Sequence, residues 1–494
     1  MRKKIGIISI LIIGLFFVVF FNFSCQSESR SKKEAISTIE KNVQGAIQNN
    51  TLVGLSIAVA RNGQLLYAKG FGLSDKQRKI PVTQQTMFAI GSITKQFTSA
   101  CIFLLAQENK LALSDPVAKY YPNLTRAADI SLLDLMNHVS GYHDYYPLDF
   151  VDRRMSEVTT VDKVIENYAG QQLDFEPGTR YSYSNTGYLI LGRVVEKVTG
   201  TPFGEFLKKR IFEPLGMNHT IFEPDPFGPG IAKGHMSFLL SPPEQVSLEA
   251  AGWVHAAGAI FSTPLDLIKW NNALFSGSVV NDENLKIMTS PRSLVDGKVS
   301  NYGCGLAIGE RNGVKFFSHN GAVNGFYAMN WYVPSTKSSL VVLSNVSDYA
   351  AVNSIFFKLV DKFLIKSQKI SEKEKPKKPE PSRPVWTSAL RPLISDPPLA
   401  TQVVNFFYSL QKGEVDRSLL GEEFNWFLTD EKIKEASVRL RALGEPQALK
   451  IENISERGGM EVSSTRLDFS AGSVRVLMYR TPDGKIQQYF VQRY

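Results

Sequence analysis

The stretch Gly91-Ser92-Ile93-Thr94-Lys95 opens an apolar run over residues 97–106 and decides how the rest of the chain is interpreted. The run predicts a buried helix, and Ser92 stands at its start, where free backbone N–H groups and the helix dipole favour negative charge. Lys95 follows one turn later on the same face. The pattern indicates a serine nucleophile beside a lysine. A capping serine followed by a surface lysine would give the same letters, and a second Ser-x-x-Lys occurs at Ser29 and Lys32.

Two later segments favour the nucleophile. Tyr183-Ser184-Asn185 precedes an apolar helical run, and His319-Asn320-Gly321 lies at the edge of a predicted strand. With Ser92 and Lys95 they resemble the motifs of the penicillin-recognising serine hydrolases, the class C β-lactamase and D-alanyl-D-alanine peptidase type. The resemblance covers residues 36–365, because further segments are similar to the same family: Leu132-Leu133-Asp134-Leu135-Met136-Asn137-His138-Val139-Ser140-Gly141, Phe212-Glu213-Pro214-Leu215-Gly216-Met217, Ala257-Gly258-Ala259-Ile260-Phe261-Ser262-Thr263 with Asp266, and Tyr302-Gly303-Cys304-Gly305-Leu306.

The resemblance implies an acyl-enzyme on Ser92. A free hydroxyl is a poor nucleophile and needs a base. Lys95 serves only if its pKa falls from about 10.4 toward neutrality. The alternative, which the resemblance favours, keeps Lys95 charged, so that it lowers the pKa of Tyr183 and the tyrosine becomes the base. Both assignments stay open at the level of sequence.

The remaining motif residues are implied to bind substrate. Asn185 would hold the substrate amide and position Lys95. Backbone N–H groups of Ser92 and Ala322 would form the oxyanion hole, where each donor is typically worth a few kcal/mol in the transition state. His319 and Gly321 would complete the substrate-binding strand. His138, within one of the similar segments, is interpreted as a structural residue.

His319 stands where a class C β-lactamase carries a lysine. A histidine near pKa 6.5 is mostly neutral at pH 7 and is a poor fixed partner for a substrate carboxylate. The expected activity is therefore hydrolysis of peptides that contain D-residues, by a carboxypeptidase or aminopeptidase type of reaction. An esterase is the second choice and a β-lactamase the third, and a non-catalytic protein that binds muropeptides or β-lactams is the rival from another class. A small peptide, β-lactam or ester is thus the expected partner, and no cofactor is expected.

The order of predicted elements indicates an α+β fold. Strands are expected over residues 54–60 and 64–70, joined by Arg61-Asn62-Gly63, because Asn-Gly is a strong hairpin signal. A helix-rich middle over 92–290 follows. Further strands are expected over 302–309, 313–318, 325–333 and 338–345, and a last helix over 350–365. Distant strands would close one antiparallel sheet, with flanking helices and an inserted helical region.

A second domain is expected after a linker. Residues 366–385 are rich in Lys, Glu and Pro and predict a solvated linker. Residues 386–494 predict a small α+β domain that resembles NTF2-like domains in pattern only. Its expected helices cover 398–411 and 429–442, and its expected strands 447–454, 459–470, 473–481 and 485–492. A packing, dimerisation or ligand-binding role for this domain stays open.

The first residues have the pattern of a targeting segment. Arg2-Lys3-Lys4 precedes an apolar run over 5–21 and then Cys25, which predicts a lipoprotein signal peptide over 1–24, a lipid on Cys25 and a tether over 25–35. A retained membrane anchor is the alternative. Both predict an exported protein attached to a membrane, and the first predicts a lipid anchor to the bacterial cell envelope.

Composition excludes several classes. Of the 494 residues 43% are hydrophobic, which excludes wholesale disorder. The net charge of +9 does not indicate a nucleic-acid partner, because Arg2-Lys3-Lys4 supply three of these charges and residues 366–384 supply four. Cys101 and Cys304 are expected to be buried free thiols, although pairing stays open. No metal-ligand spacing is found, and the sequence does not fix the oligomeric state.

Overall fold

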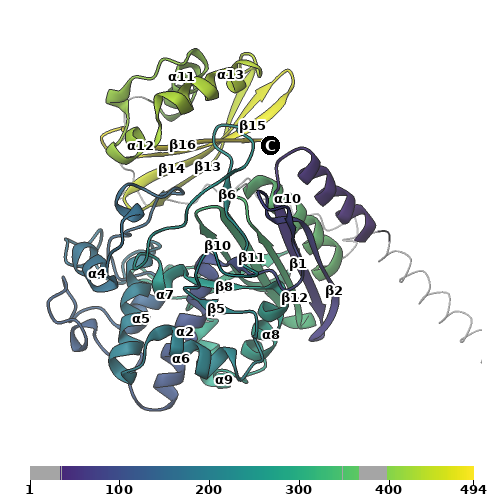
Figure 1. Cartoon of the computed structure of the whole chain (residues 1–494). Coiled ribbons are helices and arrows are strands. Elements are labelled where there is room, and N and C mark those ends of the chain that lie inside the picture. Colours follow the sequence, from purple (N-terminus) through teal and green to yellow (C-terminus); the bar gives the residue numbers. More distant parts are fainter. Residues whose placement is uncertain (1–33, 35, 348, 366–397, 494) are drawn as a thin grey trace, which may run out of the picture.

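Strands from both ends of the first domain close one sheet. In the computed structural model, which describes residues 34, 36–347, 349–365 and 398–493, seven strands pair antiparallel in the order β3-β2-β1-β12-β11-β10-β9. β1 lies beside β12, with Ile57 opposite Val342 (Figure 1). The strands span Gly54–Arg61 (β1), Gln64–Asp75 (β2), Ile80–Pro81 (β3), Ala307–Arg311 (β9), Val314–Val323 (β10), Phe326–Val333 (β11) and Ser338–Ser344 (β12). The expected α+β fold with one antiparallel sheet is confirmed.

The hairpin signal between the first two strands is also confirmed. Asn62 and Gly63 have φ angles of 50° and 73°, the left-handed values that a two-residue hairpin turn requires. This turn sets the register of β1 on β2 and so fixes which side chains of β1 face the helices.

A helical region is inserted between β3 and β9 and covers one face of the sheet, while α10 and a helix over residues 36–48 cover the other face. The elements are Phe88–Ala89 (β4), Gly91–Ile93 (η1), Thr94–Gln107 (α2), Val117–Lys119 (η2), Leu132–Met136 (α3), Arg154–Ser156 (η3), Val161–Ala169 (α4), Asn185–Thr199 (α5), Phe203–Leu207 (α6), Lys208–Phe212 (η4), Ile221–Phe222 (β5), His235–Met236 (β6), Glu244–Gln245 (β7), His255–Gly258 (α7), Ile260–Ser262 (β8), Pro264–Phe275 (α8), Asp282–Met288 (α9), Pro334–Thr336 (η5), Tyr349–Leu359 (α10) and Val360–Leu364 (η6).

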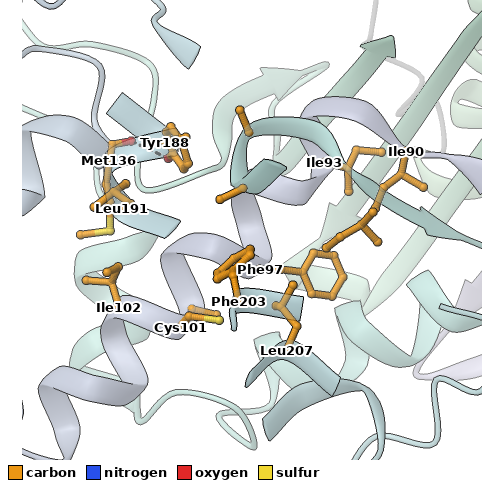
Figure 2. Packing of buried hydrophobic residues seen from close by; sticks show 14 of the residues in the cluster. Ile90, Ile93, Phe97, Cys101, Ile102, Met136, Tyr188, Leu191, Phe203 and Leu207 are labelled. Atoms are coloured by element: carbon orange, nitrogen blue, oxygen red, sulfur yellow. Dashed lines mark hydrogen bonds between the residues drawn. The ribbon is translucent and has the colours of Figure 1, made fainter. Parts of the chain in front are cut away.

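Helix α2 runs through the centre of this region. Phe97 stacks on Trp270, with ring centroids 4.0 Å apart, and Cys101 is fully buried. Figure 2 shows Phe97, Cys101 and Ile102 packed among residues of neighbouring helices, including Leu191, Phe203 and Leu207. Burying each such side chain contributes roughly 1.5–3 kcal/mol. A helix enclosed on nearly all sides cannot shift, so Ser92 and Lys95 at its start are held in place.

The second domain has its own sheet. Strands β13 to β16 form an antiparallel meander, and three helices pack on it around a separate apolar cluster. The elements are Leu399–Lys412 (α11), Arg417–Leu419 (η8), Glu422–Phe427 (α12), Asp430–Arg441 (α13), Ala448–Arg457 (β13), Met460–Phe469 (β14), Gly472–Arg480 (β15) and Ile486–Arg493 (β16). The short α12 was not expected from the sequence. The resemblance to NTF2-like domains stays a prediction.

The two domains share apolar contacts. Phe150 and Phe238 belong to the first domain, yet both lie in the apolar cluster of the second. Phe150 stacks on Phe427, with centroids 4.4 Å apart, and Phe238 meets Phe490 edge to face at 5.5 Å. The second domain is therefore docked through buried aromatic rings.

Three strand predictions were wrong by five residues at one end. β2 continues to Asp75 rather than ending at 70. β9 begins at Ala307 rather than 302, because Gly305 adopts a φ of 75° and lies so close to α2 that a Cβ there would come within 2.5 Å of the Lys95 carbonyl oxygen. The residues before it bond to other segments instead of extending the strand: the Cys304 N–H donates to the Met288 carbonyl oxygen, and the Tyr302 hydroxyl bonds to His319 Nε2. β10 continues to Val323 rather than ending at 318, because its polar and glycine residues still pair with β11.

Several expectations fall outside the described residues. Residues 1–24, Cys25 and the linker 366–385 are among them, as are the first residues of the expected second domain. Across 36–347, 349–365 and 398–493, no helix is both long and apolar enough to cross a membrane. Cys101 and Cys304 are buried and free.

Candidate active site

The motif residues of the sequence meet at one cavity between the two domains. Ser92 lies in η1, Tyr183 and Asn185 lie at the start of α5, and His319 and Ala322 lie on β10; all five line a cavity of about 460 Å³. Segments that are far apart in the sequence are thus brought together, as the resemblance implied.

Lys95 lies behind Ser92 and is fully buried. Its Nζ is 3.0 Å from Ser92 Oγ, and it donates hydrogen bonds to Asn185 Oδ1 and to the carbonyl oxygen of Ala257, both at 2.7 Å. Burial holds the pKa of Lys95 well below its usual value; Asp144 opposes this shift and Arg457 adds to it. A neutral amine has two N–H groups, which these two oxygens occupy, so its lone pair faces Ser92.

Tyr183 has the opposite shift. Burial raises its pKa well above the usual value for a phenol, and a hydrogen bond with Ser92 only partly offsets this. Lys95 Nζ lies 4.9 Å from the Tyr183 ring centroid. In the free protein Tyr183 is therefore a neutral phenol next to Ser92.

The backbone around Ser92 forms a site for an oxyanion. The turn at residues 324–325 joins β10 to β11, and Val323 pairs with Phe326 at its base. Backbone N–H groups alternate in direction along an antiparallel strand, so the N–H of the preceding residue, Ala322, points away from β11. β9 pairs with β10 only as far as Ser318, which leaves that edge of the strand open toward η1. A Cβ at Gly91 would come within 2.7 Å of Ala322 N, and one at Gly321 within 1.9 Å of the Ile90 carbonyl oxygen. Only glycines allow β10 and η1 to approach this closely.

His319 is neutral and its ring nitrogens are both occupied. Burial, aided by Lys95, lowers its pKa to about 3. Nδ1 contacts the Asn320 carbonyl oxygen and must carry the proton there, so Nε2 accepts a hydrogen bond from the Tyr302 hydroxyl at 2.8 Å. The imidazole therefore offers no cation to a substrate carboxylate.

His138 supports the site from behind. Its Nδ1 accepts a hydrogen bond from the Ser184 backbone N–H at 3.1 Å, and its ring lies 4.2 Å from the Tyr183 ring. It is 1% exposed and does not line the cavity. This placement agrees with a structural role.

Asp144 is a functional residue that was not predicted from the sequence. Its Oδ1 accepts hydrogen bonds from both the backbone N–H and the side-chain Nδ2 of Asn185, each at 3.0 Å. Asp144 therefore caps α5 and also fixes the orientation of the Asn185 amide, so that Oδ1 faces Lys95. An acidic residue in a loop carries no local signal of this function.

The second domain also lines the cavity, which the sequence did not indicate. Residues of β13, β14 and β15 form part of the wall: Ser455, Glu456, Arg457, Val462, Leu477 and Tyr479. In the described part of the chain, no group of three or more His, Cys, Asp or Glu side chains could hold a metal ion.

Comparison with known proteins gives the family. A family model described as Beta-lactamase matches residues 39–354. The chain is 30% identical over 246 residues to the teichoic acid D-alanine hydrolase of Staphylococcus aureus, an alignment that covers 48% of this chain and 57% of that protein.

Solved structures agree with this match. The D-amino acid amidase of Ochrobactrum anthropi SV3 is 27% identical, with a TM-score of 0.56, over 66% of this chain and 97% of that chain. The octameric penicillin-binding protein homologue of Pyrococcus abyssi covers 92% of this chain and 99% of its own, with a TM-score of 0.59 and 22% identity, which indicates a shared fold.

Proposed function

Because the chain belongs to the Beta-lactamase family and is a serine hydrolase, we propose that it hydrolyses an amide or ester of a D-amino acid through an acyl-enzyme on Ser92. One observation carries the proposal: a buried lysine with a lowered pKa lies 3.0 Å from a serine hydroxyl that faces the cavity. This is the arrangement that activates a serine nucleophile.

We assign the base to Lys95. Ser92 Oγ bonds to the substrate carbonyl carbon while its proton passes to Lys95 Nζ, and the carbonyl oxygen becomes an oxyanion. The N–H groups of Ser92 and Ala322 stabilise that charge. The pKa directions support this assignment over Tyr183, since the lysine is shifted toward its neutral form and the phenol is shifted away from its anionic form.

Tyr183 then serves as the acid. When the oxyanion collapses, the bond to the leaving amine or alcohol breaks, and the leaving atom takes the phenolic proton. The Lys95 ammonium returns a proton to the phenolate. Water next attacks the acyl carbon and passes a proton to Lys95. The bond from that carbon to Ser92 Oγ then breaks, and the Lys95 ammonium returns the proton to Ser92 Oγ, which regenerates the neutral amine.

The substrate class rests on similarity and on His319. Two of the similar proteins are a teichoic acid D-alanine hydrolase and a D-amino acid amidase. The neutral imidazole, with Nε2 bonded to Tyr302, supports a substrate that needs no cation for a carboxylate at this position. For the same reason we expect β-lactams to be poor substrates.

Matched substrates test the proposal. D-alanine p-nitroanilide and a D-alanyl ester should be hydrolysed faster than their L-enantiomers, and a fluorophosphonate probe should label the protein. Ser92→Ala should abolish turnover and labelling. Ser29→Ala, in the other Ser-x-x-Lys, is the matched control and should change neither. Equal rates for both enantiomers would overturn the substrate class, and an active Ser92→Ala variant would overturn the nucleophile.

We also propose that Cys25 carries a lipid that anchors the exported protein to the cell envelope. The basic, apolar and cysteine pattern of residues 2–25 supports this. In a bacterial host, the wild type should sediment with membranes and Cys25→Ala should be released. Retention of the variant would favour an uncleaved anchor instead.

A further inference from the structure

The second domain reaches the candidate active site through a hairpin. β13 ends at Arg457, and Gly458 and Gly459 form the turn to β14. Gly458 lies against the first domain, where a Cβ would come within 2.8 Å of Pro147. The turn therefore packs closely against the first domain, and Arg457 lines the same cavity as Ser92.

Arg457 contacts three groups of the loop over residues 144–149. Its Nη2 donates to the Tyr146 carbonyl oxygen at 3.0 Å, its Nη1 is 3.2 Å from Asp149 Oδ1, and its Nε is 3.9 Å from Asp144 Oδ2. Asp149 is fixed in turn by the Tyr479 hydroxyl at 2.9 Å. The contacts hold this loop against the second domain.

Two of these groups also hold Asn185. The Tyr146 carbonyl oxygen accepts a second hydrogen bond, from Asn185 Nδ2 at 3.4 Å, and Asp144 accepts three from Asn185. Asn185 Oδ1 in turn holds Lys95. A continuous chain of contacts thus joins the guanidinium group to the amine beside Ser92.

We propose that Arg457 is a positioning residue of the Ser92 centre, supplied by the second domain, which fixes Asp144 and the Tyr146 carbonyl so that Asn185 holds Lys95 in place. The proposal rests on the proposed function. It means that the hydrolytic site is complete only with the second domain docked, which gives that domain a catalytic purpose.

The charge of Arg457, like its contacts, supports the active state of Lys95. It lowers the pKa of Lys95 and that of Tyr183, whereas Asp144 raises both. The other titratable groups around the amine, His138, His319 and Tyr188, are kept neutral by burial. Arg457 is thus the cation that offsets Asp144 and favours a neutral Lys95.

The docking of this domain does not depend on Arg457 alone. Phe150 and Phe238 are buried in its apolar cluster, and Arg439 donates hydrogen bonds to the Leu239 and Phe238 carbonyl oxygens at 3.1 and 3.5 Å. Arg439 does not line the cavity. It therefore offers a matched control, an interface arginine without a connection to Asn185.

The test compares Arg457→Gln, Arg457→Lys and Arg439→Gln in the full chain. Arg457→Gln should lower kcat roughly 10- to 100-fold, because a displaced catalytic group costs about that much. KM should change little. The acid limb of the kcat/KM profile should move to higher pH, since loss of the cation raises the pKa of Lys95. Arg457→Lys should restore the position of the limb, and Arg439→Gln should leave both kcat and the limb unchanged.

Two results would overturn the proposal: an unchanged pH profile in Arg457→Gln, or equal losses in Arg457→Gln and Arg439→Gln, which would reduce Arg457 to a docking contact. A double-mutant cycle of Arg457→Gln with Asp144→Asn, measured by thermal unfolding, tests the contact between the two residues without any turnover. Its result therefore does not depend on whether the proposed function is correct. Coupling between the two residues supports the proposal, and additive effects contradict it.

Discussion

At the scale of the residue, Lys95 is the centre of the chemistry. An amine held by the Asn185 side chain and the Ala257 carbonyl has one direction left, and that direction faces Ser92. Burial favours the neutral form, so the lone pair, rather than a proton, points at the hydroxyl. The geometry and the pKa shift thus support the same state of the residue.

Replacing Lys95 tests this directly. Lys95→Met should lower kcat/KM by about 10²- to 10⁴-fold, the usual contribution of a general base, while the fold persists because the side chain fills similar space. Steady-state kinetics and circular dichroism measure the two effects. Lys32→Met changes the other Ser-x-x-Lys and should leave kcat/KM at the wild-type value. Wild-type rates in Lys95→Met would contradict the assignment of the base.

The pH dependence of the free energy of unfolding follows from two buried histidines. Burial lowers the pKa of His319 to about 3 and also lowers that of His138, so both imidazoles favour the neutral form in the folded protein. The unfolded chain does bind protons below about pH 6.5, so the free energy of unfolding should decrease as the pH falls below that value. Urea titrations at several pH values measure this.

The same two histidines should not affect the pH dependence of catalysis. kcat/KM should show no limb that belongs to a histidine, and His319→Gln should leave the acid limb in place. A limb near pH 6.5 that disappears in His319→Gln would show that this imidazole titrates and would contradict its assigned neutral state.

At the scale of the element, the contact between β10 and η1 shapes the oxyanion site. Gly321 lies against the Ile90 carbonyl oxygen, and a Cβ added at Gly321 would come within 3.0 Å of Ser92 N. Its neighbour Ala322 directs its N–H to the same place. The two backbone donors therefore depend on how closely one strand approaches one helical turn.

Gly321→Ala should separate these elements. The added methyl group would sit 1.9 Å from a backbone oxygen, so β10 must shift and kcat should decrease strongly, with a loss of about 1–3 kcal/mol in stability from overpacking. Gly45→Ala, in the helix over residues 36–48 with no atom within 4 Å of the new Cβ, is the control. It should keep full kcat. An active Gly321→Ala variant would show that the close approach is not required.

The elements also show what sequence alone predicts. Ser92 lies in the helical turn just before α2, Asn185 begins α5, and Asn62-Gly63 forms a turn, so local patterns were enough to place them. The end of β10 and the loop before β9 were mispredicted, because long-range contacts decided them: pairing with β11 and packing on α2.

At the scale of the whole molecule, the second domain supplies part of the wall of the candidate site. Arg457 reaches it from a strand whose sequence has no catalytic pattern, and its contact with Asp144 joins two domains. No local signal in either segment predicts such a pair, since only the docked arrangement of two folded domains brings them together. The docking itself rests on the aromatic contacts of Phe150 and Phe238.

Weakening those contacts should therefore reduce activity from a distance. Phe150 is fully buried against Phe427 and does not line the cavity. Phe150→Ala should cost about 3–5 kcal/mol of stability, as for other buried aromatic residues. It should also lower kcat, because a loosely docked domain withdraws Arg457 from Asp144. Phe227→Ala removes the same ring from a site that is 74% exposed and should alter neither value. Calorimetry and kinetics on the two variants separate the outcomes, and a destabilised Phe150→Ala protein with full kcat would mean that the hydrolase works without its second domain.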